Sequence, residues 1–151
     1  MTLKKLLILP FFFILISCSY EPIFAKKNVN SISINEITFE GDKKINRLIT
    51  NQLNLNKSDN QNISYDLNLN SSKKIETLAK DSQGDDSIYR TTIRVTLTLE
   101  KQEVVFKEKL FVLSFSYNNI KNKFDLSEYQ KSIDSDLINK ITQEINIYLS
   151  S

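Results

Sequence analysis

Apolar residues recur along the chain with two different spacings, and these predict strands and helices in a fixed order. An alternation of apolar and polar residues is typical of a strand with one buried face. A spacing of three and four is typical of a helix with one apolar side. The predicted strands cover residues 30–40, 63–69, 93–99 and 104–117, and the predicted helices cover residues 42–53 and 125–149.

The first strand changes phase along its length. Ile32 and Ile34 share one face, whereas Ile37 and Phe39 have the opposite parity. A β-bulge near Asn35 would bring both pairs to one side, because one extra residue reverses the alternation. We therefore expect an irregular first strand.

Both predicted helices begin next to an acidic residue that can cap free backbone amides. Asp42 precedes the first helix, and Asp125 followed by Glu128 fits the capping box of the second. The apolar stripes are Ile45, Leu48, Ile49 and Leu53 in the first helix, and Tyr129, Ile133, Leu137, Ile138, Ile141, Ile145, Tyr148 and Leu149 in the second. The long second stripe predicts that this helix packs on the sheet.

The later strands differ in how much of their surface is apolar. Residues 75–79 extend the second strand after a slip, and 81–86, centred on Gly84, predict a turn. The second half of the last strand is apolar on both faces: Phe111, Leu113, Phe115 and Tyr117 lie on one, and Leu110 and Val112 on the other. We expect this half to be covered on two sides, with the aromatic residues in the domain's own core.

These elements predict an α/β fold, a two-layer sandwich with a four-stranded mixed sheet and two helices on one face, in the order β-α-β-β-β-α. The first three elements suggest a right-handed crossover that makes the first two strands parallel. The remaining strands are then a meander of antiparallel neighbours.

The N-terminal segment has the layout of a secretory signal. Lys4 and Lys5 precede an apolar run of eleven residues, 6–16, whereas a membrane-spanning helix needs about 20. The sequence Leu-Ile-Ser-Cys at 15–18 resembles the bacterial lipobox, in which the cysteine takes lipid and becomes the first residue of the mature protein. We therefore expect lipidation at Cys18, the only cysteine.

This interpretation divides the chain into a signal peptide (1–17), a lipidated tether (18–29) and a single α/β domain (30–151). In lipoproteins that the segment resembles, a serine after the cysteine, here Ser19, favours the outer membrane. Two other interpretations remain open: a buried free cysteine, or secretion of an unacylated product.

Composition argues against several functional classes. The chain has 20 Lys and Arg against 18 Asp and Glu, and removal of residues 1–17 takes away two lysines, which leaves no net charge. Nucleic-acid binding rests on an excess of clustered cations. Histidine is absent and glycine occurs twice, so the usual acid-base residue and a glycine-rich phosphate loop are missing. We read the cluster Asp81, Asp85 and Asp86 as a solvated turn, and expect no enzyme activity, metal or cofactor.

Several short motifs together resemble the LptE family of lipopolysaccharide-assembly lipoproteins. The opening Cys-Ser-Tyr-Glu-Pro-Ile-Phe at 18–24 is similar to the start of mature family members, although Ser19 replaces the usual glycine. Further similarities are the early β-α unit at 32–53, Tyr-Asp-Leu at 65–67, Arg90 at the start of a strand, Ser-Phe-Ser-Tyr at 114–117 and a terminal helix. The resemblance covers most of the mature chain.

The resemblance implies a non-catalytic plug inside the LptD β-barrel, in the machine that places lipopolysaccharide in the outer leaflet. Partners would then be an LptD-like barrel, the membrane through the lipid anchor, and lipopolysaccharide. Its phosphates need cations, and the candidates are Arg90, Arg94, Lys101, Lys107 and Lys109. An ordinary solvated hairpin is the alternative for these residues. An accessory lipoprotein of another envelope complex, or a lipid-anchored enzyme, remains an alternative for the chain.

Overall fold

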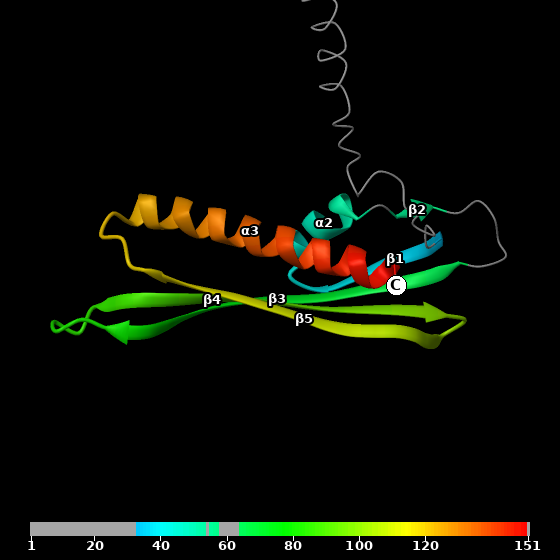
Figure 1. Cartoon of the computed structure of the whole chain (residues 1–151), viewed down its shortest axis with the longest axis horizontal. Helices are drawn as coiled ribbons and strands as arrows, with labels where there is room; N and C mark the ends of the chain where they lie inside the picture. The colour runs from blue at the N-terminus through cyan, green and yellow to red at the C-terminus, as the bar shows by residue number, and fades with distance from the viewer. Residues whose placement is uncertain (1–32, 54, 58–63, 151) are drawn as a thin grey trace, which may run out of the picture.

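The computed structural model describes residues 33–53, 55–57 and 64–150, arranged as two helices over one face of a long twisted sheet (Figure 1). The elements are β1 (Ser33–Gly41), α2 (Lys43–Gln52), β2 (Asn56–Lys57), β3 (Tyr65–Lys80), β4 (Asp86–Lys101), β5 (Val104–Asn118) and α3 (Lys123–Ser150). The four long strands and two helices confirm the predicted fold class and order. The short β2 adds a fifth strand, and the sheet order is β2-β1-β3-β4-β5.

The parallel pairing of β1 with β3 confirms the predicted crossover through α2. Its register shifts between Ile34 and Ile37, which is the irregularity that the phase change near Asn35 predicted. As a result, Ile34 is buried and Ile37 also packs against the core. Asp42 caps α2 as predicted, because its carboxylate accepts hydrogen bonds from the backbone amides of Lys44 and Ile45 at 3.0 and 3.1 Å.

Gly41 joins β1 to α2 at a point where the chain approaches β3 closely. Its φ is +71°, a left-handed conformation that favours glycine. A Cβ atom there would clash with the carbonyl oxygen of Ser71, which accepts a hydrogen bond from the Asp42 amide at 2.8 Å. The Ser71 hydroxyl donates back to the Asp42 carbonyl at 3.0 Å. The start of α2 is thereby fixed to the middle of β3.

β3, β4 and β5 form the predicted antiparallel meander. Gln102 and Glu103 connect β4 to β5 with positive φ angles of 51° and 64°, the backbone that a tight two-residue hairpin requires. β3 is a continuous strand to Lys80, and its register shifts near Thr77 and Ala79 rather than before Ile75. The predicted register shift before residues 75–79 is therefore wrong. Leu69 and Ile75 are an even number of residues apart, so both lie on the same face of a regular strand.

The core lies between the sheet and the helices. β4 contributes four fully buried apolar side chains at alternate positions, as its pattern predicted. The buried apolar residues are Ile34, Ile45, Ile49, Leu53, Leu67, Leu69, Ile93, Val95, Leu97, Leu99, Phe111, Tyr117, Ile133, Leu137, Ile138, Ile141 and Ile145. No helix in the described part of the chain is long and apolar enough to cross a membrane.

The long helix begins earlier than its sequence suggested. α3 starts at Lys123, and the Asn122 side chain accepts a hydrogen bond from the Phe124 amide at 2.9 Å. Asp125 therefore lies inside the first turn, and the predicted capping box at Asp125 and Glu128 is wrong. Glu128 instead forms an ion pair with Lys131 at 2.6 Å, one turn further along.

The signal peptide, Cys18, Ser19 and the tether lie outside the described residues. So do residues 30–32, the predicted beginning of the first strand.

Candidate functional site

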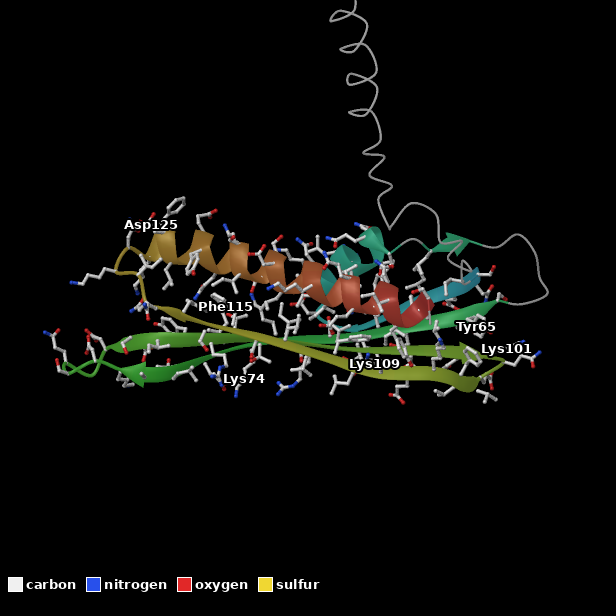
Figure 2. All side chains as sticks on the ribbon, viewed as in Figure 1. Tyr65, Lys74, Lys101, Lys109, Phe115 and Asp125 are labelled. Atoms are coloured by element: carbon white, nitrogen blue, oxygen red, sulfur yellow. The ribbon has the colours of Figure 1, made fainter. Side chains whose placement is uncertain are left out.

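No described element covers the face of the sheet that points away from both helices (Figure 2). Helix-facing residues alternate with residues of this open face, because successive side chains of a strand point to opposite sides. Cross-strand pairs therefore form rows on the open face, such as Asn70, Thr96 and Leu110. The neighbouring row is Ser72, Arg94 and Val112. The face carries hydroxyl, amide and charged groups, with an apolar margin on β5.

β5 carries that apolar margin. Leu110 is 56% exposed and Val112 is 44% exposed, both on the open face. Among the described residues only α3 covers this half of the strand, on the opposite face, so cover on the second side stays a prediction. Val104, Val105 and Phe106, beside the turn from β4, are exposed as well. Exposed apolar side chains collected in one place are common on protein surfaces that contact other molecules.

β5 is also the last strand in the sheet order. Among the described residues no strand pairs with its outer edge, although it runs for 15 residues. Unpaired edges are templates for pairing with another chain, and soluble proteins usually shorten, charge or cover them. Lys107, Glu108 and Lys109 supply charge to one half only. The half from Leu110 to Tyr117 has no charged residue.

The aromatic residues of β5 largely fill the core, as expected. Phe111 and Tyr117 are 1% and 4% exposed, and the Tyr117 hydroxyl accepts a hydrogen bond from the Gln130 side chain at 2.9 Å. Phe115 departs from that expectation, since it shares their face but is 45% exposed.

The five predicted basic residues do not form one cluster. Arg90 and Arg94 lie on the open face, paired with Ser116 and Val112. Lys107 and Lys109 lie on the helix-facing side, with their Nζ atoms 5.3 and 5.1 Å from the centre of the Tyr148 ring of α3. The fifth, Lys101, is at the end of β4, beside the turn.

This contact with Tyr148 could not be predicted from the pattern, because Tyr148 is about 40 residues away along the chain. Glu108, which interrupts the lysines in sequence, pairs with Thr98 on the open face. The structure therefore separates Lys107 and Lys109 from the carboxylate between them.

Acidic groups balance the arginines of the open face. Lys74, through a hydrogen bond and its charge, holds the pKa of Glu76 below its usual value, and Arg90 and Arg94 contribute less. Lys74 Nζ lies 2.6 Å from Glu76 Oε2. Further along, the Glu40 carboxylate accepts hydrogen bonds from the amides of Asn68 and Asn70 at 3.3 and 3.1 Å. Charge on this face is thus largely compensated.

The acidic cluster forms a turn, as expected. The Asp81 carboxylate accepts hydrogen bonds from the amides of Gln83 and Asp85 at 2.9 and 3.0 Å. A cleft of about 920 Å³ lies between this turn and the connection from β5 to α3. Tyr89 lies in the wall of this cleft. Desolvation is the main cause that raises the pKa of its hydroxyl, and the nearby carboxylate of Asp86 raises this pKa further.

Within the described ranges, no group of three or more acidic, cysteine or histidine residues is placed to hold a metal ion.

One inward-facing charge could not be recognised from the pattern. Lys73 of β3 points to the helix side, where its Nζ lies 2.6 Å from the carboxylate of Asp134 in α3. Both side chains are partly buried, and the second Asp134 oxygen is buried without a hydrogen bond to the described residues. This pair lines a small cavity of about 120 Å³ between α2 and α3, and its role is to join the helix layer to the sheet.

Comparison with known proteins relates the fold to small bacterial lipoproteins. No protein-family model and no curated protein matches the sequence. Rare lipoprotein B from Shewanella oneidensis aligns with a TM-score of 0.53 at 16% identity, over 74% of this chain and 93% of that one. A minor lipoprotein from Acinetobacter baumannii gives 0.54 at 16% identity, over 79% and 92%.

Uncharacterized lipoprotein B from Nitrosomonas europaea gives a TM-score of 0.55 at 10% identity, over 83% of this chain and 91% of that one. None of these three proteins is described as an enzyme. At such identities the likeness establishes a shared fold, and it extends over nearly the whole of each neighbour.

Proposed function

We propose that the chain is a non-catalytic outer-membrane lipoprotein, lipidated at Cys18, that plugs an LptD-like β-barrel and assists its assembly. It would face the periplasm or lie inside the barrel lumen. The observation that carries the proposal is the exposure of Leu110 and Val112 on a sheet face that no described element covers. The fold shared with bacterial lipoproteins and the lipobox-like sequence at 15–18 support it.

The open face suits a polar barrel interior. Its central rows carry hydroxyl and amide groups, which can exchange hydrogen bonds with water for hydrogen bonds to a polar wall. The apolar margin on β5 adds contact area that is favourable to bury, at about 25 cal/mol per Å². A plug held in this way needs no catalytic group.

The first test is recovery of the partner barrel. The tagged mature protein, purified from detergent-solubilised outer membranes of the organism that makes it, is expected to bring a large β-barrel protein with it. The double variant Leu110→Asp, Val112→Asp should lower that recovery tenfold or more, equivalent to about 1.4 kcal/mol, because two carboxylates would lose their hydration at the contact. Mass spectrometry identifies and quantifies the barrel.

Matched controls separate this contact from general effects of added charge. Phe124→Asp with Ile147→Asp changes two exposed apolar residues of α3, 71% and 69% exposed, on the other side of the molecule. That variant should retain the barrel. Equal loss in both variants would count against the open face as the contact. Cys18→Ser should lose its acyl mass and leave the membrane fraction, which tests the anchor separately.

The accessory-lipoprotein alternative makes a different prediction in the same experiment. If the recovered partner belongs to a barrel-assembly or transporter complex, the lipid-anchored binding domain stands, but the lipopolysaccharide assignment fails.

We assign lipopolysaccharide binding to Lys107 and Lys109. Their ammonium groups both lie near the Tyr148 ring, whereas Arg90 and Arg94 share their surroundings with Glu76. The variant Lys107→Glu, Lys109→Glu is expected to retain purified lipopolysaccharide several-fold less well, because the charge that meets its phosphates is reversed. Binding is measured by retention on the immobilised protein, with circular dichroism to check the fold.

Arg90→Glu with Arg94→Glu is the matched reversal on the open face. Its binding should remain close to that of the unaltered protein. A larger loss from the arginine pair would transfer the site to the open face, and no loss from either pair would remove both from the assignment.

A further inference from the structure

A groove lies at the end of the domain where the chain enters β1. It has a volume of about 420 Å³. Ile37, Leu53 and Leu55 give it apolar walls, and Glu36 is exposed at its side. Its complete lining is Ile34, Asn35, Glu36, Ile37, Thr50, Leu53 and Leu55. The groove therefore joins the irregular part of β1 to the end of α2.

The groove lies along the irregular part of β1. β1 departs from its regular pairing with β3 between Ile34 and Ile37. On its other edge, the pairing with β2 among the described residues covers only Ser33 and Ile34. Apolar walls beside a partly unpaired strand edge are suited to an extended peptide with apolar side chains.

The chain itself supplies such a peptide close by. The segment before β1 is polar from Lys26 to Asn28, but Tyr20, Ile23 and Phe24 upstream are apolar or aromatic. Phe24 is nine residues before Ser33, a connection that can span about 30 Å when extended. Since the groove lining begins at Ile34, directly after Ser33, this connection is long enough for the segment to fold back.

Charge favours the same occupant. Lys26 and Lys27 follow Phe24 after one residue, Ala25, and Glu36 is the charged residue of the groove lining. A tether that places the Phe24 ring in the groove and returns to β1 would bring these two ammonium groups toward that carboxylate. Opposite charges at the edge of a binding site mainly determine the orientation of the bound partner. Here they favour one of the two directions in which the peptide could lie along β1.

We propose that residues 20–24 of the mature chain dock in this groove, with Ile23 and Phe24 against its apolar walls and Lys26 and Lys27 toward Glu36. This inference rests on the proposed lipid anchor at Cys18, because docking changes how far the domain can lie from the membrane. With an undocked tether, the 15 residues from Cys18 to Ser33 span up to about 50 Å. With residues 20–24 docked, only two residues separate Cys18 from the docked segment, or about 7 Å. Docking thus brings the domain close to the membrane surface.

Fluorescence tests the docking directly, because the chain contains no tryptophan. A single reporter is introduced as Phe24→Trp in the mature chain carrying Cys18→Ser, in buffer without detergent. We expect an emission maximum at shorter wavelength and several-fold weaker quenching by acrylamide than for the matched reporter Asn28→Trp in the polar part of the tether. Equal emission and equal quenching of the two reporters would overturn the proposal.

Groove variants identify what shields the reporter. Leu55→Asp places a charge in the apolar wall and should make Phe24→Trp as accessible as Asn28→Trp. Since Leu55→Asp can also affect folding, Glu36→Lys provides a second variant at an exposed position. It should increase quenching, and Lys26→Glu with Lys27→Glu should reverse that increase. If Phe24→Trp is shielded from acrylamide and none of these variants changes its quenching, the proposal is overturned.

Two further outcomes name other occupants, and both contradict the proposal. Shielding only after detergent is added would assign the groove to acyl chains. Shielding only in the barrel complex would assign it to the partner. The measurement uses neither lipid nor barrel, so failure of docking is distinguishable from failure of the proposed function.

Discussion

Replacing Gly41 with alanine is expected to lower the free energy of unfolding by about 3 kcal/mol. A left-handed conformation costs a residue with a Cβ roughly 1–2 kcal/mol, and a weakened buried hydrogen bond costs about as much again. Both apply here, because φ is +71° and the new Cβ would displace the Ser71 carbonyl from the Asp42 amide. The midpoint of urea unfolding, at unchanged slope, measures the loss.

Gly84→Ala is the matched control. This glycine also has a positive φ, +87°, but a Cβ there meets nothing within 4 Å. Its cost should therefore be limited to the backbone term, about 1 kcal/mol. If both substitutions cost the same, the close approach to Ser71 does not contribute, and the link between the start of α2 and β3 is not a determinant of stability.

Truncation of Phe111 to alanine is expected to cost about 3–5 kcal/mol, the usual range for a buried phenylalanine. Its side chain is 1% exposed and packs edge-on against Tyr148, with ring centres 6.0 Å apart. The change leaves a cavity between β5 and α3 that the surrounding side chains fill only in part. Urea unfolding, followed by circular dichroism, gives the difference.

Phe115→Ala tests the same truncation on the same face of the same strand. Since Phe115 is 45% exposed, its loss should cost about 1 kcal/mol or less, as is usual at surface positions away from special features. A cost as large as that of Phe111→Ala would show that α3 covers the edge strand more completely than described. Comparison of the two losses in unfolding free energy therefore tests whether Phe111 belongs to the core and Phe115 does not.

Local patterns predicted most of the fold. The alternation in β4 identified its buried side, and Asp42 identified the start of α2, because each signal is contained within a few neighbouring residues. Even the register shift after Ile34 was visible, since Ile37 and Phe39 change parity with respect to it. Strand order and the parallel first pair followed from the element order and from the strong preference for right-handed crossovers.

Features that depend on distant parts of the chain could not be predicted in this way. Asp125 looked like the helix cap, but Asn122 provides the cap three residues earlier, in a connection whose geometry is set by where β5 ends. Apolar residues on both faces of β5 predicted two covering layers. The pattern does not tell which element covers each face. In the described part of the chain both helices lie on one face of the sheet, so Leu110 and Val112 on the other face are exposed.

The candidate basic site shows the same limit at finer scale. Arg94 and Lys107 were candidates for the same ligand, because both are basic residues on two strands of one hairpin. Their positions relative to the pleat place them on opposite faces of the sheet. The contact of Lys109 with Tyr148 depends on how α3 packs back along β5. Which charges act together is therefore a tertiary property.

The direction in which α3 runs has a practical consequence for experiments. The start of β1 and the end of α3 lie toward one end of the long axis, and the turn between β3 and β4 lies at the other (Figure 1). A fusion after Ser150 would therefore stand beside the entering chain and crowd any assembly formed there. An epitope inserted next to Gly84, where open space surrounds the backbone, would project from the opposite end. That turn is the better place for a tag or a spectroscopic label.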